Sequence, residues 1–333
     1  MHFLDSENNW LRKIVLFLSS QTISLFGSSL VQYAIMWHIT LSSNSGGMMT
    51  IAIICGFLPT FFLSPFAGVW ADRYNRKLLI ILSDSLIAVA TLLLAVLFLL
   101  GYDDLWLLFA MSVVRSFGAG IQMPAVNAFI PQVVPEDKLI KVNSTNGSIQ
   151  SFVTLVSPML SAALLTKTTI ELIFFIDVIT ALIAVIILLF FLQVPVHAKA
   201  LQRDTGNYFV DLREGVTYIK NHEYVKRFFL FGAVFFFLAA PVAFLTPLQV
   251  IRSFGDEVWR LSAIEVVFSS GMMAGGIFMA GWGGLSNRVH TMALASFATG
   301  AFTFALGLVP SFWIYLLFIK LTKIIIPIFN IPT

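Results

Sequence analysis

The stretch GVWADRYNRK at residues 68–77 sets charged and amide side chains between two long apolar runs. The first run ends at Trp70 and the second begins at Leu78. The chain as a whole is 58% hydrophobic and only 11% charged, so this concentration of polar groups is unusual for it. It indicates a tight connection between two apolar helices, placed where the chain meets water.

The composition around this turn is that of a membrane protein. Soluble domains carry roughly 25% charged residues, and here the mean hydropathy is +0.90. The net charge of +3 is too small to favour nucleic acid as a partner. Because Cys55 is the single cysteine, an intramolecular disulfide is excluded. Neither a metal site nor a cofactor is expected.

Apolar runs along the chain predict ten membrane-spanning helices. Each run is long enough to cross about 30 Å of hydrocarbon at 1.5 Å per residue. The predicted spans cover residues 14–39, 48–70, 78–100, 105–129, 145–166, 170–193, 228–250, 262–284, 290–310 and 311–330.

Lys and Arg residues set the expected orientation of these spans. If the N-terminus lies in the cytoplasm, the outer loops hold only Lys167, Arg252 and Arg260, and the other basic residues outside the spans fall on the inner side. Cytoplasmic loops of membrane proteins typically carry such an excess of Lys and Arg. We therefore expect a multi-pass protein of the plasma membrane with a cytoplasmic N-terminus.

A polar connection divides the predicted spans into two sets. We expect a six-helix bundle at 1–193, a cytoplasmic linker with an amphipathic surface helix at 194–227, and a partial second bundle at 228–333. This all-α arrangement is the layout of a two-bundle transporter.

The turn at 68–77 also resembles a known signature, the loop motif of the major facilitator superfamily. The residues that carry the resemblance are Gly68, Asp72, Arg73, Asn75, Arg76 and Lys77. The family has glycine where this chain has Asn75, and Asn tolerates left-handed backbone better than other residues with a side chain. The resemblance implies a conformational latch in which Gly68 allows close helix approach and Asp72 docks on the other bundle. The alternative is that the basic residues only anchor the loop at the membrane surface.

Two further stretches point to the same family. The segment around Arg115 resembles its intramembrane arginine motif, and Gly147 with Ser157-Pro158 resembles its antiporter motif, with serine in place of glycine. The run from Arg115 to Leu165 is most similar to the macrolide-efflux branch of drug:proton antiporters. Since members of the superfamily have twelve spans, the resemblance implies that the last two of an expected twelve are missing.

Four ionisable residues inside the spans are candidates for proton or charge coupling: Arg115, Asp177, Glu265 and Asp84. A charge in hydrocarbon costs about 2.5–3.5 kcal/mol on insertion scales, so these side chains are expected to face the bundle interior. Arg115 either acts on an anionic group or forms a structural ion pair, with Asp84 as a candidate partner. Asp177 and Glu265 either carry protons or are structural. Asp84, nearer a span end, is expected to be structural.

Polar residues at helical spacing predict where a substrate pathway lies. One face of the first span carries Gln21, Ser24, Ser28 and Gln32. One face of the fifth span carries Asn146, Gln150, Thr154 and Ser157. With Arg115 and Gln122 of the fourth span they would line a central cavity. Hydrogen-bonded helix packing is the alternative for each face.

The combined expectation is a proton-driven exporter that works by alternating access. The resemblance implies bulky amphipathic cargo of the multidrug or macrolide type. The expected partners are this small molecule, protons and membrane lipid, and the chain is expected to be a monomer. The alternatives are a siderophore, lipid or metabolite as cargo, or an inactive truncated transporter. An enzyme is not expected, because the five histidines are scattered and neither H-E-x-x-H nor a phosphate-binding glycine loop occurs.

Overall fold

The computed structural model describes residues 2–194, 217, 220–282 and 288–329, and this part of the chain is helical, with no strand. The helices of the first half are α1 (His2–Ser43), α2 (Gly46–Arg73), α3 (Arg76–Leu99), α4 (Leu105–Val133), α5 (Leu139–Lys167) and α6 (Ile170–Ile186). The short turn η1 (Glu136–Lys138) precedes α5, and the π-helical turn η2 (Ile187–Phe191) extends α6. The second half holds α9 (Glu223–Phe254), α10 (Val258–Trp282), α11 (Arg288–Leu306) and α12 (Phe312–Phe329).

Seven segments of the described chain are long and apolar enough to cross a membrane. Six of them coincide with α1 to α6 and the seventh with α10, while α11 contains a shorter apolar helix at His290–Leu306. Helices lie where the sequence predicts spans. The total of ten spans stays a prediction. The same holds for the expectation that the last two of twelve spans are missing.

The predicted linker at 194–227 falls largely on residues outside the described part of the chain. The same holds for most of its expected amphipathic helix. At its far end the structure differs from the prediction, because α9 already begins at Glu223.

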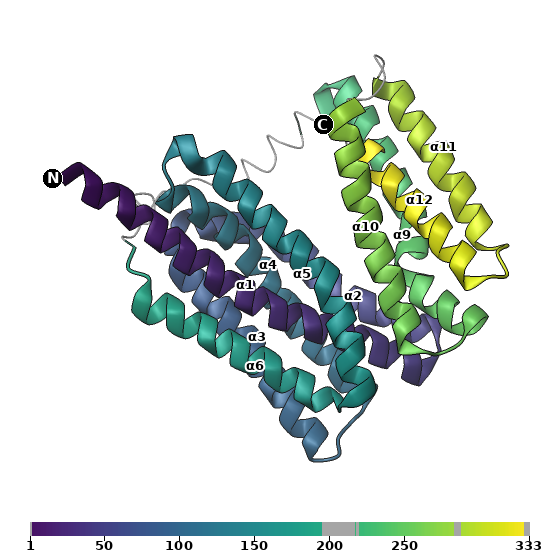
Figure 1. Ribbon diagram of the computed structural model, residues 1–333, viewed down its shortest axis with the longest axis horizontal. Helices are drawn as coiled ribbons and strands as arrows, with labels where there is room; N and C mark the ends of the chain where they lie inside the picture. Colours follow the sequence, from purple (N-terminus) through teal and green to yellow (C-terminus); the bar gives the residue numbers. More distant parts are fainter. Residues whose placement is uncertain (1, 195–216, 218–219, 283–287, 330–333) are drawn as a thin grey trace.

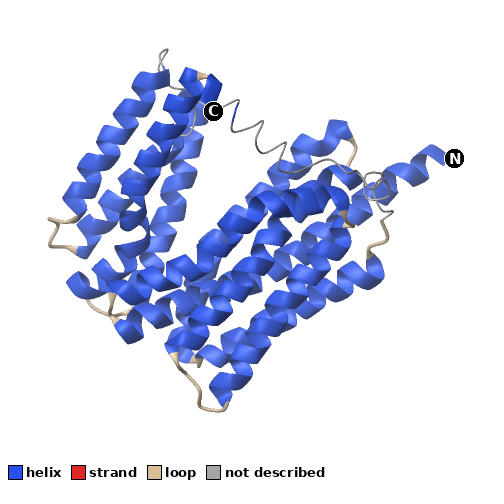
Figure 2. Cartoon of the chain, turned by 180° about the vertical axis from the view of Figure 1, so that it is seen from behind, coloured by secondary structure: helices blue, strands red, loops and turns tan. Residues whose placement is uncertain are grey.

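The helices form two bundles, α1–α6 and α9–α12, which meet at one end and diverge toward the end that holds the N-terminus (Figure 1). The view from behind shows the same wedge (Figure 2). Helix α5 packs against α10, and α2 against α9, so the bundles touch along these two pairs. The 68–77 motif covers the end of α2, the short turn and the start of α3, and this turn lies at the diverging end.

The closed end of the wedge is an apolar core shared by both bundles. Trp37 of α1 is fully buried there, in one cluster with Leu261 of α10 and Tyr315 of α12. A polar contact at the same end joins the bundles, because Arg252 Nη2 of α9 donates to the carbonyl oxygen of Asn44 at 2.9 Å. Asn44 follows α1 directly and has a left-handed backbone, with φ of 44°.

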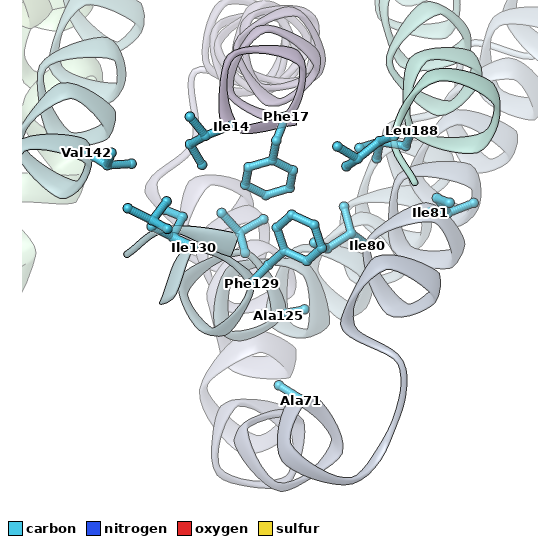
Figure 3. Packing of buried hydrophobic residues seen from close by; sticks show 13 residues of the cluster. Ile14, Phe17, Ala71, Ile80, Ile81, Ala125, Phe129, Ile130, Val142 and Leu188 are labelled. Atoms are coloured by element: carbon cyan, nitrogen blue, oxygen red, sulfur yellow. The ribbon is translucent and has the colours of Figure 1, made fainter. Parts of the chain in front are cut away.

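Inside the first bundle, two apolar cores lie one above the other. The core toward the diverging end centres on Phe17 and Phe129, whose ring centroids are 4.4 Å apart, with Ile80 beside them (Figure 3). The other core includes Phe98 and Phe174, with ring centroids 5.6 Å apart. Dense packing of this kind holds helices together where lipid surrounds them. The buried ionisable residues of this bundle, Asp84, Arg115 and Asp177, lie along their helices between these two cores.

Candidate functional site

A buried ion pair lies in the middle of the first bundle. Arg115 of α4 donates from Nη1 to Oδ2 of Asp177 on α6 at a distance of 2.6 Å. Arg115 is 5% exposed and Asp177 is 0% exposed. Opposite charges at this depth are compatible with a stable bundle because each is paired and hydrogen-bonded.

Two hydroxyl residues complete the surroundings of this pair. Thr91 of α3 and Ser28 of α1 each donate to the Asp177 carboxylate at 3.0 Å. Arg115 donates to the Thr91 hydroxyl as well, and to the Ser28 carbonyl oxygen at 3.1 Å. Side chains from α1, α3, α4 and α6 therefore meet in one charged cluster.

Two glycines let these helices approach closely enough for the cluster to form. A Cβ atom on Gly27 would lie 3.0 Å from the Asp177 Cα and would clash with the Thr180 side chain. A Cβ atom on Gly118 would lie 2.6 Å from the Ile87 side chain. The absence of a side chain thus brings α1 against α6 and α4 against α3 at the level of the ion pair.

The partner of Arg115 corrects one interpretation of the sequence. The sequence suggests Asp84 as the candidate partner for a structural ion pair, and the structure pairs Arg115 with Asp177 instead. Thr91, which touches the pair, and Asp84 stand two turns apart on α3. At 1.5 Å per residue this places Asp84 about 10 Å farther along the helix.

Asp84 belongs to a second polar layer, which is buried deeply and does not lie at a span end. Its Oδ1 accepts hydrogen bonds from Ser24 of α1 at 3.0 Å and from Gln122 of α4. Asp84 is 1% exposed, and its Oδ2 is buried with no hydrogen-bond partner. Gln21 of α1 lies close enough to interact with this carboxyl group, yet its amide nitrogen makes no hydrogen bond.

A cavity of about 170 Å³ runs beside both layers. Its polar lining comes chiefly from Ser24, Ser28, Gln32, Arg115, Ser116 and Gln122. The structure therefore brings the polar face of α1 together with Arg115 and Gln122 of α4. Gln21 is buried on the same helix and does not line the cavity.

The polar face of α5 does not join this cavity. Asn146, Gln150 and Thr154 are not among the residues that line it. Thr154 is exposed, and its hydroxyl donates to the Gln150 carbonyl oxygen of its own helix at 2.9 Å. This face of α5 and the face of α1 are thus separate in this conformation.

The antiporter-type residues of α5 lie in two different surroundings. Ser157 and Pro158 are buried, and the Ser157 hydroxyl has no hydrogen-bond partner. Gly147 is exposed, and a Cβ atom built on it would meet nothing within 4 Å. No common site is formed by these three residues.

The turn at 68–77 is built differently from the expectation at two positions. Asn75 has φ of −63°, so it is not left-handed; it caps α3, and its side-chain oxygen accepts a hydrogen bond from the Leu78 amide at 3.3 Å. Asn is among the best residues for this role. A Cβ atom on Gly68 would meet nothing within 4 Å, so the expected close helix approach at Gly68 is absent from this conformation.

The basic residues of the turn bind backbone oxygens inside the first bundle. Arg76 donates to the carbonyl oxygens of Ala71 and Ala128, each at 2.8 Å, and pairs with Asp72 at 3.3 Å. Asp72 itself is largely exposed, with 57% of its side chain accessible. These contacts fasten α2, α3 and α4 to one another. Docking of Asp72 on the second bundle stays a prediction.

Lys77 extends this fastening to α6. Its Nζ donates to the carbonyl oxygen of Leu192, just beyond η2, at 2.7 Å. Cations are favourable near the carbonyl ends of helices. The two neighbouring basic residues thus tie three helix ends to the start of α3.

Glu265 lies two turns inside α10, where the bundles meet. The Tyr33 hydroxyl of α1 and the Lys323 ammonium of α12 both interact with its carboxylate. Lys323 Nζ also lies 3.8 Å from the ring centre of Phe268. Glu265 is therefore flanked by groups from both bundles.

The patterns of the sequence do not single out Thr91 and Tyr33 as site residues. Thr91 carries a usable signal, because it follows Asp84 by two turns on the same face of α3. Tyr33 carries none, since an aromatic residue in an apolar helix is ordinarily a packing residue.

A larger cavity of about 680 Å³ lies among α9 to α12. Aromatic side chains such as Phe235, Phe244 and Phe268 line it, together with the hydroxyl of Thr299. Lys323 is the charged residue on its described lining. In the described part of the chain, no group of three or more His, Cys, Asp or Glu side chains could hold a metal ion.

Comparison with known proteins shows which family and which relatives this chain is similar to. The Major Facilitator Superfamily profile matches residues 14–331. Macrolide efflux protein A of Streptococcus pyogenes is 28% identical over 329 residues, covering 98% of this chain and 81% of that protein. Macrolide efflux protein A of Enterococcus faecalis is 28% identical over 288 residues, covering 86% of this chain and 89% of that protein.

Among solved structures, a bacterial homologue of the human lysosomal transporter Spinster, in an inward-facing and unoccupied conformation, has a similar fold. The TM-score is 0.65 and the sequence identity 14%, over 96% of this chain and 74% of that one. At this identity the likeness concerns the fold alone.

Proposed function

This chain belongs to the major facilitator superfamily, and we propose that it exports bulky amphipathic compounds of the macrolide type in exchange for protons. It is a multi-pass membrane transporter of small molecules and not an enzyme. The proposal adds the direction of transport, the cargo and the driving ion.

The proposed orientation puts the N-terminus in the cytoplasm of the cell and the chain in the plasma membrane. The basic residues Arg73, Arg76 and Lys77 lie at the diverging end of the wedge, as does the N-terminus. Basic residues favour the cytoplasmic side. The bundles would then be closed toward the outside and open toward the cytoplasm.

The charged cluster of Arg115 and Asp177 carries the proposal most directly. It lies beside a polar cavity, between two cores that are otherwise apolar. Ionisable residues at this depth are costly and mark ion or substrate pathways by default. Any carboxyl group that lines or adjoins this cavity, and is reached alternately from the two sides of the membrane, would couple proton entry to drug exit.

The cargo is inferred from the relatives and from the second bundle. Both macrolide efflux proteins match most of this chain. The 680 Å³ cavity among α9 to α12 is mainly apolar and aromatic, which suits the body of a large amphipathic molecule.

Drug retention in cells tests this function. Cells that lack their own macrolide exporters would express the chain, and the retained radiolabelled macrolide would be measured with and without a protonophore. We expect the chain to lower retention only while the proton gradient stands. With retention normalised to the amount of inserted protein, Arg115→Ala should abolish the effect, whereas Lys141→Ala, at an exposed basic residue of α5, should not. Retention equal to that of empty cells, or export that ignores the protonophore, would contradict the proposal.

A further inference from the structure

Asp177, Glu265 and Asp84, the three acids that the sequence singles out inside the spans, differ in what surrounds them. Asp177 is paired with Arg115 and receives two further hydroxyl donors. Glu265 lies next to the Lys323 ammonium. In the described part of the chain, Asp84 is the one of these three acids on which no cation acts: its hydrogen-bond partners, Ser24 and Gln122, are neutral, and both reach the same oxygen.

The other oxygen of Asp84 is the decisive atom. Oδ2 is buried and has no hydrogen-bond partner. A carboxylate in this position would hold a buried negative charge without a counter-charge, which is strongly unfavourable. A proton on Oδ2 removes that charge, so the observed surroundings fit the neutral acid.

The charged groups on the helices packed against α3 reinforce this state. Helix α4 contributes Arg115, whose guanidinium is already bonded to Asp177. Helix α6 contributes Asp177, which repels a second negative charge; its other acid, Glu171, lies in the first turn of α6 and acts on His38 instead. Helix α1 presents to Asp84 the neutral side chains of Ser24 and Gln21.

A proton on Asp84 also has a route. Both hydrogen-bond partners of Asp84, Ser24 and Gln122, line the 170 Å³ cavity that reaches Arg115. One water molecule occupies about 30 Å³ in the liquid, so the cavity has room for several. The Ser24 hydroxyl and water together can pass a proton between the carboxyl group and the cavity, while the Gln122 amide holds the carboxyl group in place.

Gln21 supplies what the deprotonated state would need. Its amide nitrogen lies near Asp84, is buried, and makes no hydrogen bond. A small side-chain rotation would let this N–H donate to Oδ2 once the proton has left. The unpaired amide N–H of Gln21 therefore lies close to Asp84 Oδ2, the carboxyl oxygen that lacks a donor.

We propose that Asp84 is the residue that binds and releases the coupling proton, with Gln21 as the donor that stabilises its charged form. The inference rests on the proposed function, because it names the proton site of the same transporter. Arg115 and Asp177 then form the fixed charged framework beside it. A sodium ion is a poorer occupant, because Ser24 and Gln122 direct donor hydrogens, and not oxygen ligands, toward Asp84.

The first test is independent of any drug. Infrared spectra of the purified full chain, recorded through a pH titration, would show the carbonyl band of a protonated carboxylic acid. We expect this band to lose intensity in Asp84→Asn and to persist in Ser83→Ala, a matched control whose buried hydroxyl makes no hydrogen bond. An unchanged band in Asp84→Asn would overturn the proposal.

The second test uses the drug. Binding of a fluorescent macrolide to the purified chain in weakly buffered detergent should release protons, with the same yield in sodium and in choline chloride. Asp84→Asn should bind the drug and lower the proton yield at least tenfold, while Ser83→Ala should release protons normally. Normal proton release by Asp84→Asn, or release that requires sodium, would refute the assignment. Failure of the unmodified chain to bind the drug would instead refute the proposed cargo, and the infrared result would still decide on Asp84.

Discussion

Asp177→Asn removes one charge from the buried pair and leaves the other in place. Arg115 would then lie in the bundle interior with no carboxylate at 2.6 Å, facing only neutral oxygens of Thr91 and Ser28. Breaking a buried ion pair in this way costs about 3–5 kcal/mol. Since each 1.4 kcal/mol is a factor of ten, the equilibrium between folded and unfolded forms should shift by roughly a hundred-fold to a few thousand-fold.

Replacing both partners should cost much less than the single changes Arg115→Met and Asp177→Leu together. An Arg115→Met, Asp177→Leu double variant leaves no buried charge, and such replacements are often close to neutral in stability. Some loss remains, because Ser28 and Thr91 then lack their acceptor. We therefore expect a coupling energy of about 2 kcal/mol or more, within the range for residues in direct contact.

The assay is thermal denaturation of the detergent-solubilised chain, followed by the amount of monodisperse protein after heating. Asp177→Asn should lower the midpoint temperature strongly, and the double variant should recover much of the loss. Asp103→Asn, at an exposed acid between α3 and α4, serves as the matched control and should leave the midpoint unchanged. Additive effects of the two single changes would refute the assignment of a coupled ion pair.

Three further predictions concern the rest of the fold. Asn75→Ala should destabilise the start of α3 by about 1 kcal/mol in a denaturation assay, whereas Asn75→Gly should cost only a few tenths, because Asn75 acts as a helix cap and not as a left-handed residue. Gly27→Val should greatly reduce the yield of monodisperse protein in gel filtration, since its side chain would overlap Thr180, and Gly27→Ala should give an intermediate yield. In an Asn44→Cys, Arg252→Cys variant whose native cysteine is replaced by alanine, a reducible bifunctional thiol reagent about as long as the Arg252 side chain should link the two positions, because that side chain reaches Asn44 across the closed end. The link should stop drug efflux until a reductant is added, and efflux by the cross-linked chain would show that this end need not open.

The sequence predicts the helices well, because span length and apolar composition are local properties. It also identifies Arg115 and Asp177 as interior charges, since an ionised residue within an apolar run is costly unless it faces the inside of the bundle. It does not reveal that they pair with each other. The pairing depends on how α4 and α6 are rotated and shifted against α3, and close contacts at Gly27 and Gly118 fix that register.

The turn at 68–77 shows a second limit of the sequence. The motif spacing suggests a left-handed Asn75 and a close approach at Gly68, and neither is present. The side chain of Asn75 can either tolerate a strained backbone or cap a helix, and only the backbone geometry distinguishes the two. A polar face presents the same ambiguity: α1 turns its face into the cavity, while the equally regular face of α5 lies elsewhere.

Transport by the purified chain alone tests the central claim most directly. The chain would be reconstituted in lipid vesicles with an acidic interior, and a fluorescent macrolide added outside. Proton-coupled exchange predicts accumulation of the drug above its external concentration and above that in protein-free vesicles with the same pH difference, and the excess should collapse when a protonophore is added. No accumulation, or an equal accumulation in vesicles without a pH difference, would contradict the claim that proton movement drives export.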